Sequence, residues 1–326
     1  ITEYRGELMG NLLRTEAIAI RSNQSVGSGQ GEGKGGGIYL HNTVMNIEKL
    51  LIHENHAEYQ GAGLFIDGES FVTLKNSWFI ENNAINQSVI QTAGGAIYIQ
   101  SSSLVKIDES EFYENYAEIG SFLLKNGYGT VNIDNSVVAF HVTFPDQEES
   151  SSIIYIDEHL PNTINELNII QSTFAYNNAQ YFLESTDING DFKTLFENSI
   201  LTNGNYEQIY INQHNGERFI INYSGLNSDE TLQPYVASGV VELINPLIVD
   251  DFMFTNPLNG NFSLQKISPV IDYAPYPDFH PFFPEYLDIN GIKRGYDEPS
   301  VVNQHGRYDL GAYEYFEDVI FASGFE

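Results

Sequence analysis

The sequence contains no cysteine, so disulfide bonds, thiolate metal sites and cysteine nucleophiles are excluded. Positive charge is also scarce, with 14 Lys and Arg residues against 44 Asp and Glu residues and a net charge of −30. Nucleic-acid-binding proteins are typically basic, so this balance argues against nucleic acid as a partner. The many carboxylates permit a hard cation such as Ca²⁺ to bind, but the sequence requires no cofactor.

Long apolar runs are absent as well. No stretch approaches the roughly 18 apolar residues of a membrane-spanning helix, so no membrane span is expected. The chain begins at Ile1 without the basic and apolar regions of a signal peptide, and we expect it to be a mature or trimmed form. Hydrophobic residues make up 42% of the chain and include 21 Tyr and 21 Phe, so a packed core is expected rather than disorder.

Two short sequence blocks alternate along the chain. In the first block, a glycine-rich turn precedes alternating apolar residues, and the fourth position reads Ile38, Leu64, Ile97, Leu123 and Ile154. The second block begins at a serine, and its copies are marked by Ser77, Ser110, Ser136, Ser172 and Ser199. Successive serines are 33, 26, 36 and 27 residues apart, which are periods typical of solenoid proteins.

Within each repeat the apolar residues alternate, as Ile97 and Ile99 do, which is the spacing of a strand and not of a helix. We therefore predict an all-β fold in which residues 1–268 form a parallel β-helix, with about three short strands in each coil. Coils of this kind stack about 4.8 Å apart. Equivalent residues of successive repeats should then lie directly above one another.

A polar column accompanies the second block. Its members are Asn55, Asn82, Asn115, His141, Asn177 and Gly204. Asparagine tolerates left-handed backbone and can hydrogen-bond to its copy in the next coil, so we predict an inward amide ladder. The alternative is a ligand-binding stripe. Three aromatic residues in register, Phe79, Phe112 and Phe174, predict stacks in the core.

The repeats fade after about Asn205, and residues 269–316 are rich in proline and aromatic residues. Proline cannot donate a ladder hydrogen bond, so this segment is not expected to form interior strands. We predict that it is an irregular cap over the open end of the β-helix, followed by a short tail at residues 317–326. Within the cap, Asp288, Arg294 and Asp309 predict an ion-paired brace, and an acid and base pair at a site is the alternative.

The chain resembles two protein families, and both resemblances favour the β-helix predicted from the repeats. Over residues 35–180, the alternation of GGGI, GAGL and GGAI with FIEN, FYEN and FAYN resembles the repeats of the polymorphic outer-membrane protein family, which are β-helical adhesins. The later segments NPLIVD, NGNFSLQ, SPVID, DINGIKR and DLGAYEY resemble, in their order, bacterial β-helix proteins of the choice-of-anchor Q type. The closing IFASGFE is similar to a tail of some secreted proteins. These resemblances imply a single-stranded right-handed, pectate-lyase-like β-helix, export, and an extracellular or cell-surface location, and they transfer no catalytic residue.

Catalytic candidates are sparse. Lys125 and Arg218 are isolated basic candidates for polysaccharide cleavage by elimination, a reaction that needs a base and cations around the substrate carboxylate. Hydrolysis needs two carboxylates. Two acidic clusters offer them, Asp157 with Glu158 and His159, and Asp250 with Asp251, but such clusters are more typical of solvated turns.

Metal-binding patterns are incomplete. His53 and His56 have H-x-x-H spacing, but their side chains diverge on a strand or turn and no third ligand is evident, so zinc is not expected. Asp187, Asn189 and Asp191 match the first ligands of a calcium loop, although the glycine and the closing glutamate of that loop are missing. Calcium therefore stays an open alternative.

The sequence supports two classes of function. The first is a non-catalytic secreted or cell-surface protein used in adhesion, extracellular matrix or self-assembly, with coils adding head to tail through an uncovered N-terminal coil. The second is a carbohydrate-active enzyme, either a polysaccharide lyase or a glycoside hydrolase. A glycan-binding module is a further alternative, in which a column of exposed tyrosines, Tyr39, Tyr98 and Tyr155, binds a surface glycan.

Overall fold

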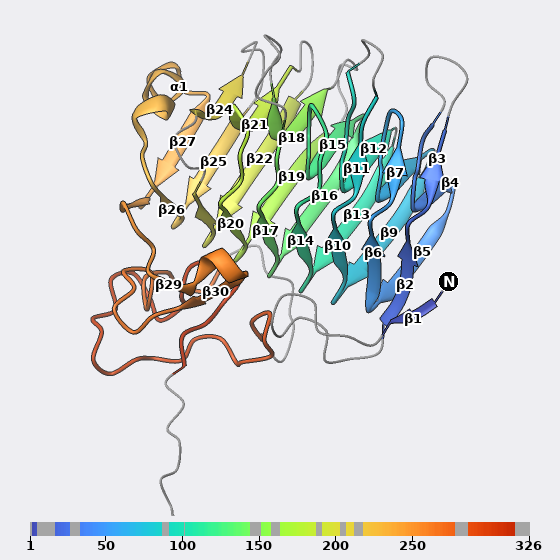
Figure 1. The fold of residues 1–326 in the computed structure, drawn as a ribbon. Coiled ribbons are helices and arrows are strands. Elements are labelled where there is room, and N and C mark those ends of the chain that lie inside the picture. The colour runs from blue at the N-terminus through green and yellow to red at the C-terminus, as the bar shows by residue number, and fades with distance from the viewer. Residues whose placement is uncertain are drawn as a thin grey trace, which may run out of the picture.

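The computed structural model describes residues 2–4, 17–26, 33–86, 91–100, 102–143, 151–157, 164–186, 191–202, 207–211, 218–277 and 286–316. Within these residues the protein is all-β, and parallel strands stack side by side into three long sheets (Figure 1). This confirms the predicted all-β class and the predicted stacking of parallel strands. No helix of the described part has the length and apolar character needed to cross a membrane.

Each repeat from β4 to β26 contributes one strand to each long sheet. The glycine-rich blocks form a seven-stranded sheet of β4 (Ile38–His41), β8 (Leu64–Asp67), β12 (Ile97–Gln100), β15 (Leu123–Asn126), β18 (Ser152–Asp157), β21 (Tyr181–Ser185) and β24 (Glu207–Ile211). The segments that follow them form an eight-stranded sheet of β5 (Val44–Glu48), β9 (Ser70–Lys75), β13 (Ser103–Asp108), β16 (Gly129–Asp134), β19 (Ile164–Ile170), β22 (Asp191–Glu197), β25 (Arg218–Asn222) and β27 (Val241–Ile244).

The serine blocks lie in a ten-stranded sheet. Its strands are β1 (Thr2–Tyr4), β2 (Ala17–Arg21), β6 (Leu50–His53), β10 (Trp78–Ile80), β14 (Glu111–Tyr113), β17 (Val137–Ala139), β20 (Thr173–Ala175), β23 (Ile200–Leu201), β26 (Gly225–Leu226) and β28 (Leu247–Ile248). A short three-stranded sheet follows, made of β3 (Gln24–Ser25), β7 (His56–Ala57) and β11 (Asn83–Ala84). Only β1 pairs antiparallel among the described strands of these four sheets.

Residues one coil apart are direct neighbours, as predicted. The apolar column of the glycine-rich block pairs in register through Ile38, Leu64, Ile97, Leu123, Ile154, Leu183 and Ile209. The aromatic column is also internal, because Phe79 and Phe112 stack with ring centroids 4.9 Å apart. Phe174 joins the same core through Phe122, at 5.8 Å. The sequence columns are therefore physical columns.

The asparagine column is a buried amide ladder. Nδ2 of Asn55 donates to Oδ1 of Asn82 at 2.9 Å, and Nδ2 of Asn82 donates to Oδ1 of Asn115 at 2.8 Å. All three side chains are fully buried, which confirms an inward structural ladder. The serines form a second ladder, in which each backbone N–H donates to the hydroxyl of the next coil, as from Ser77 to Ser110 at 3.1 Å.

The left-handed backbone lies one residue earlier than predicted. Glu54, Glu81 and Glu114, which precede the ladder asparagines, have φ values of 54°, 53° and 53°. The asparagines themselves are not left-handed. The left-handed residue makes the sharp turn of the backbone, and the asparagine after it directs its side chain inward.

His141 occupies an asparagine position without breaking the core. Its Nε2 lies 3.2 Å from the carbonyl oxygen of Phe112, and since a carbonyl only accepts, Nε2 carries the proton. Asn115 makes the equivalent bond to Phe79. Burial lowers the pKa of His141 to about 4, so the ring is neutral and imitates the amide donor. Gly204 lies outside the described residues.

The C-terminal segment lies along the side of the stack and not across its end (Figure 1). It begins with a hairpin of β29 (Phe254–Asn256) and β30 (Asn261–Leu264), joined by the 3-10 helix η2 (Pro257–Asn259). Apolar residues of this hairpin and of residues 269–277 and 286–316 form one cluster with the outer face of the ten-stranded sheet. This corrects the predicted end cap, because the apolar outer face of that sheet is what the segment buries.

The C-terminal end of the interior is covered by a different element. The 3-10 helix η1 (Glu230–Leu232) and helix α1 (Gln233–Ser238) lie beside β24 and β27 (Figure 1). Leu232 is fully buried in the inner core, and Tyr235 and Val236 pack against it. At the other end, β4 and β5 are edge strands of their sheets, and the inward-facing Met45 is only partly buried among the described residues.

Gly311 fixes the C-terminal segment to the sheet, and we expect Gly311→Ala to destabilise the protein by about 2 kcal/mol. Its φ is 86°, and a Cβ would lie 2.5 Å from Oγ1 of Thr173 and 2.9 Å from Cδ1 of Ile200. The measurement is the urea unfolding midpoint. Gly291→Ala is the matched control, because Gly291 has a φ of 77° and open space around its Cβ position. Equal shifts in both variants would mean that backbone strain alone is responsible.

Candidate functional site

The tyrosine column is in register but is not uniformly exposed. Tyr39, Phe65 and Tyr98 are vertical neighbours whose rings stack nearly parallel, at 5.3 and 4.9 Å. Tyr39 is 49% exposed, whereas Tyr98 is 4% exposed and Tyr155 is intermediate. The expected exposure of Tyr98 is therefore corrected. Since stacked rings cover one another's faces, little aromatic face remains for a sugar.

The two basic catalytic candidates lie in different environments. Lys125 is 1% exposed and points inward between Ile99 and Ile156, where Nζ donates to the carbonyl oxygen of Gly127 and to Oδ1 of Asn165. The ammonium group is therefore removed from any substrate outside, and β15 ends one residue later, at Asn126, before the bend at Gly127. Arg218 is exposed, and its Nη2 pairs with Oε2 of Glu242 at 2.6 Å.

The acidic clusters do not converge on a common site in the described part of the chain. Asp157 ends β18 and accepts from Oγ1 of Thr186 at 3.3 Å, while Glu158 and His159 lie outside the described residues. Asp250 and Asp251 are exposed, as expected of a solvated turn.

Most of the calcium candidates lie outside the residues that the structure describes. Asp187 and Asn189 lie outside the described residues, and Asp191 is placed only as the first residue of β22. Calcium binding at this loop stays a prediction.

The predicted brace is buried, but its ion pair has a different partner. Asp288, Arg294 and Asp309 are 1%, 4% and 1% exposed. Nη1 of Arg294 lies 3.7 Å from Oε2 of Glu314. Asp288 and Asp309 instead accept backbone N–H groups, as from Ile292 at 2.7 Å and Tyr315 at 2.6 Å. Burial, with Arg294 opposing it, raises the pKa of Glu314 to about 7.

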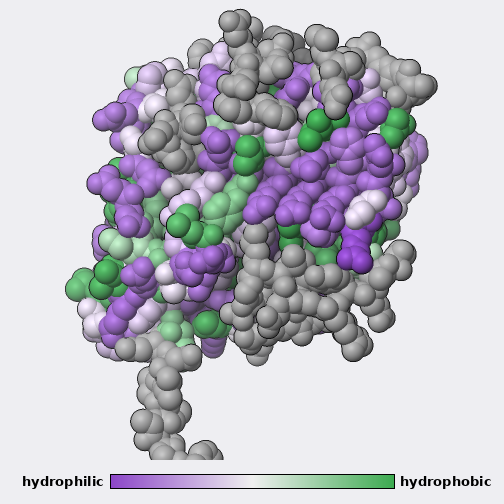
Figure 2. Space-filling model, in the orientation of Figure 1, coloured by the Kyte–Doolittle hydropathy of each residue, from purple (hydrophilic) through white to green (hydrophobic). Residues whose placement is uncertain are grey.

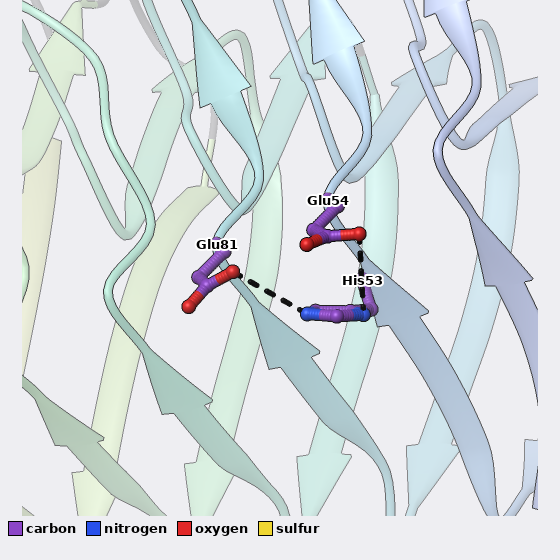
Figure 3. Close-up of side chains that lie close together, drawn as sticks. All are labelled: His53, Glu54 and Glu81. Carbon is purple, nitrogen blue, oxygen red and sulfur yellow. Dashed lines mark ion pairs between the residues drawn. The ribbon is translucent and has the colours of Figure 1, made fainter.

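One cluster of metal-ligating side chains stands out among the described residues. Nε2 of His53 lies 3.4 Å from Oε2 of Glu81, and Nδ1 lies 3.9 Å from Oε2 of Glu54. Figure 3 shows the imidazole between the two carboxylates, at the ends of strands from successive coils. One ligand atom from each residue lies within 4.8 Å of the others. His56 is not part of the group, in agreement with the expectation that H-x-x-H side chains diverge.

The cluster extends along the stack. Glu114, one coil beyond Glu81, has its pKa raised by partial burial and by the charge of Glu81. A nitrogen and two carboxylate oxygens suit a borderline ion such as Zn²⁺ better than Ca²⁺, which takes oxygen ligands. The same arrangement also suits a protonated imidazole paired with two carboxylates. The sequence carried a signal for it, because a glutamate precedes the ladder asparagine in three successive repeats.

A groove crosses the turns between the seven-stranded and eight-stranded sheets. It has a volume of about 570 Å³ and is lined by Asn42, Gly68, Glu69, Ser102 and Tyr128. These residues come from four successive coils, so three spacings of about 4.8 Å make the groove about 14 Å long. Hydrophilic side chains also cover much of the face of the stack seen in Figure 2.

An exposed apolar column runs beside this groove. Val44, Phe71 and Leu104 are vertical neighbours on the outer face of the eight-stranded sheet and are 80%, 55% and 44% exposed. Each of these three residues lies two positions after a residue that lines the groove, namely Asn42, Glu69 and Ser102. The polar groove and the apolar column together form one surface that follows the axis of the stack.

No protein-family model, curated protein or solved structure matches the chain.

Proposed function

We propose that this chain is an exported, non-catalytic adhesion protein that binds an extended ligand, a surface glycan, along the groove. In this proposal the stack is a single-stranded right-handed β-helix displayed outside the cell. Support for export comes from the adhesin-like repeats and from a net charge of −30, which keeps a long solenoid soluble.

The observation that carries the proposal is the groove of Asn42, Gly68, Glu69, Ser102 and Tyr128. Its direction along four coils fits a linear polymer, because successive coils place their turns at regular spacing and each turn adds a residue to the lining. Phe71 and Tyr128 supply aromatic surface, and the turn residues supply hydrogen-bonding groups. Glu69, which lies in the lining itself, favours a neutral glycan over a polyanionic one at the groove.

The test is a panel of neutral polysaccharides, assayed by affinity electrophoresis with the wild-type protein and variants. Phe71→Ala and Tyr128→Ala should each weaken binding of the retained glycan by about tenfold, which is about 1.4 kcal/mol. Ile267→Ala is the matched control, because Ile267 is an apolar residue of the C-terminal segment that is 71% exposed. Failure of every neutral glycan to bind, or an equal loss in the control, would refute the proposal.

A second candidate function is glycoside hydrolysis at Glu54 and Glu81. The observation that favours it is the approach of their carboxylate oxygens to within 4.8 Å of one another, close to the roughly 5 Å separation used by retaining enzymes. The same polysaccharide panel, assayed for new reducing ends, separates hydrolysis from binding.

Self-association through the edge strands β4 and β5 stays a prediction. We expect particle length in light scattering to grow with protein concentration, since an edge strand offers unpaired backbone groups. A constant monomer mass across concentration and salt would contradict it.

A further inference from the structure

A second pocket, of about 370 Å³, lies in the C-terminal segment. Its lining includes three cationic residues, Lys293, Arg294 and Arg307, and two aromatic residues, Tyr296 and Phe316. No carboxylate belongs to its described lining. This composition is unusual for a chain in which acidic residues outnumber basic ones by 44 to 14.

Within the described part of the chain, no carboxylate pairs with either of the two outer cations. Lys293 and Arg307 are both exposed, and neither forms an ion pair with a carboxylate in the part of the chain that the structure describes. By contrast, Lys75 pairs with Asp108 and Glu109, and Arg218 pairs with Glu242. Two cations that no described carboxylate compensates therefore lie at one pocket and are available to an anionic ligand.

Arg294 is held rigidly within the same wall. Its Nη2 donates to the carbonyl oxygen of Gly311 at 2.9 Å and to Oδ1 of Asn135, and its Nη1 faces Glu314. Its Nε is buried and has no hydrogen-bond partner among the described residues. An unpaired buried donor is costly, so a ligand or water that satisfied it would be favoured.

The aromatic pair adds a surface suited to a ring. Tyr296 and Phe316 pack edge to face with centroids 4.9 Å apart, and Phe316 is 46% exposed. The C–H face of a sugar packs well on such a ring, while a carboxylate on the sugar reaches the cations. The net charge of −30 does not forbid this, because charges more than about 8 Å away are largely screened at physiological ionic strength.

We propose that this pocket binds an acidic sugar through its carboxylate, with Lys293 and Arg307 as the charge partners and the Tyr296–Phe316 pair as the platform. The site is separate from the groove and goes beyond the function proposed for it. It gives the protein a way to select glycans that carry uronate units.

The test is isothermal titration calorimetry of the full chain with galacturonate at about 0.15 M salt. Glucose is titrated as the neutral counterpart, and acetate as the simple carboxylate. We expect galacturonate to bind and glucose and acetate to bind much more weakly. Lys293→Gln and Arg307→Gln should each weaken galacturonate binding by about fivefold, in the range of one exposed ion pair. Phe316→Ala should weaken it while leaving the circular dichroism unchanged.

Lys49→Gln is the matched control. Lys49 is an exposed lysine on the turn before β6, so this substitution removes the same charge at a place away from the pocket. Phe71→Ala should keep full galacturonate binding, which separates this site from the groove. Equal affinity for galacturonate and glucose, absence of binding, or an equal loss in Lys49→Gln would overturn the proposal. Acetate binding as tightly as galacturonate would overturn the assignment to a sugar.

Discussion

Asn82→Ala is expected to lower the free energy of unfolding by about 4 kcal/mol, because it interrupts the amide ladder at its centre. Oδ1 of Asn82 accepts from both the backbone N–H and Nδ2 of Asn55, at 3.1 and 2.9 Å. Its Nδ2 donates to Ile52 and to Asn115, at 2.9 and 2.8 Å. Alanine leaves the backbone N–H and one of the two Nδ2 hydrogens of Asn55 without an acceptor in a fully buried position, at a cost of about 1–3 kcal/mol each, while the other Nδ2 hydrogen keeps its bond to Ile20.

The measurement is urea unfolding followed by circular dichroism, together with hydrogen exchange. Each coil contacts only its neighbours, so the lost protection should centre on the strands β6, β10 and β14. Asn46→Ala is the control, because Asn46 is an exposed asparagine of β5 and its loss should cost less than about 0.5 kcal/mol. Similar midpoints for the two variants would show that the ladder contributes little.

Glu111→Gln is expected to stabilise the protein by about 3 kcal/mol above pH 8 and to have little effect near pH 4. Glu111 is buried between the ten-stranded sheet and the C-terminal segment, where Trp78 and Tyr113 donate to its two oxygens at 3.2 and 2.7 Å. Burial raises the pKa of Glu111 from 4.5 to about 7, although both donors oppose this shift. The folded state therefore favours the neutral carboxyl group.

The sign of the pH dependence follows from that shift. A carboxyl group with a raised pKa contributes its stability fully below pH 4.5, and the contribution is lost as the pH rises through about 7. Glutamine keeps the shape and never ionises, and the hydroxyl of Tyr113 can turn to accept from its amide. Unfolding free energies of wild type and variant should therefore diverge between pH 4.5 and 8.

The control for this series is Glu48→Gln, since Glu48 is exposed on β5. Its stability curve should run parallel to that of the wild type at every pH. If the Glu111→Gln curve also ran parallel, the carboxyl group would be ionised in the folded protein, and its burial would not govern the pH dependence.

The sequence determined the repeat and therefore the core. Strand alternation and a period near 30 residues place Ile38, Leu64 and Ile97 above one another, because parallel stacking converts equal sequence positions into spatial neighbours. The inward asparagine ladder followed from the same rule. Even the irregular member, His141, could be assigned to the ladder, since its register is fixed by the residues around it.

The tertiary structure alone decided how segments without a repeat are packed. No period places residues 269–277 and 286–316, and their position depends on which apolar surface remained uncovered, which was the outer face of the ten-stranded sheet. The same holds for the brace, where Arg294 pairs with Glu314 and not with the predicted aspartates.

The candidate sites also differ in whether the repeat or irregular backbone forms them. The glutamates beside His53 could have been found from the sequence, because each precedes a ladder asparagine and so shares its register. The cationic pocket could not, because Lys293 and Arg307 come together through an irregular fold of the chain. The spacing of residues in the sequence determines which residues of a repeat become neighbours. A site built by irregular backbone depends on long-range packing, which that spacing does not determine.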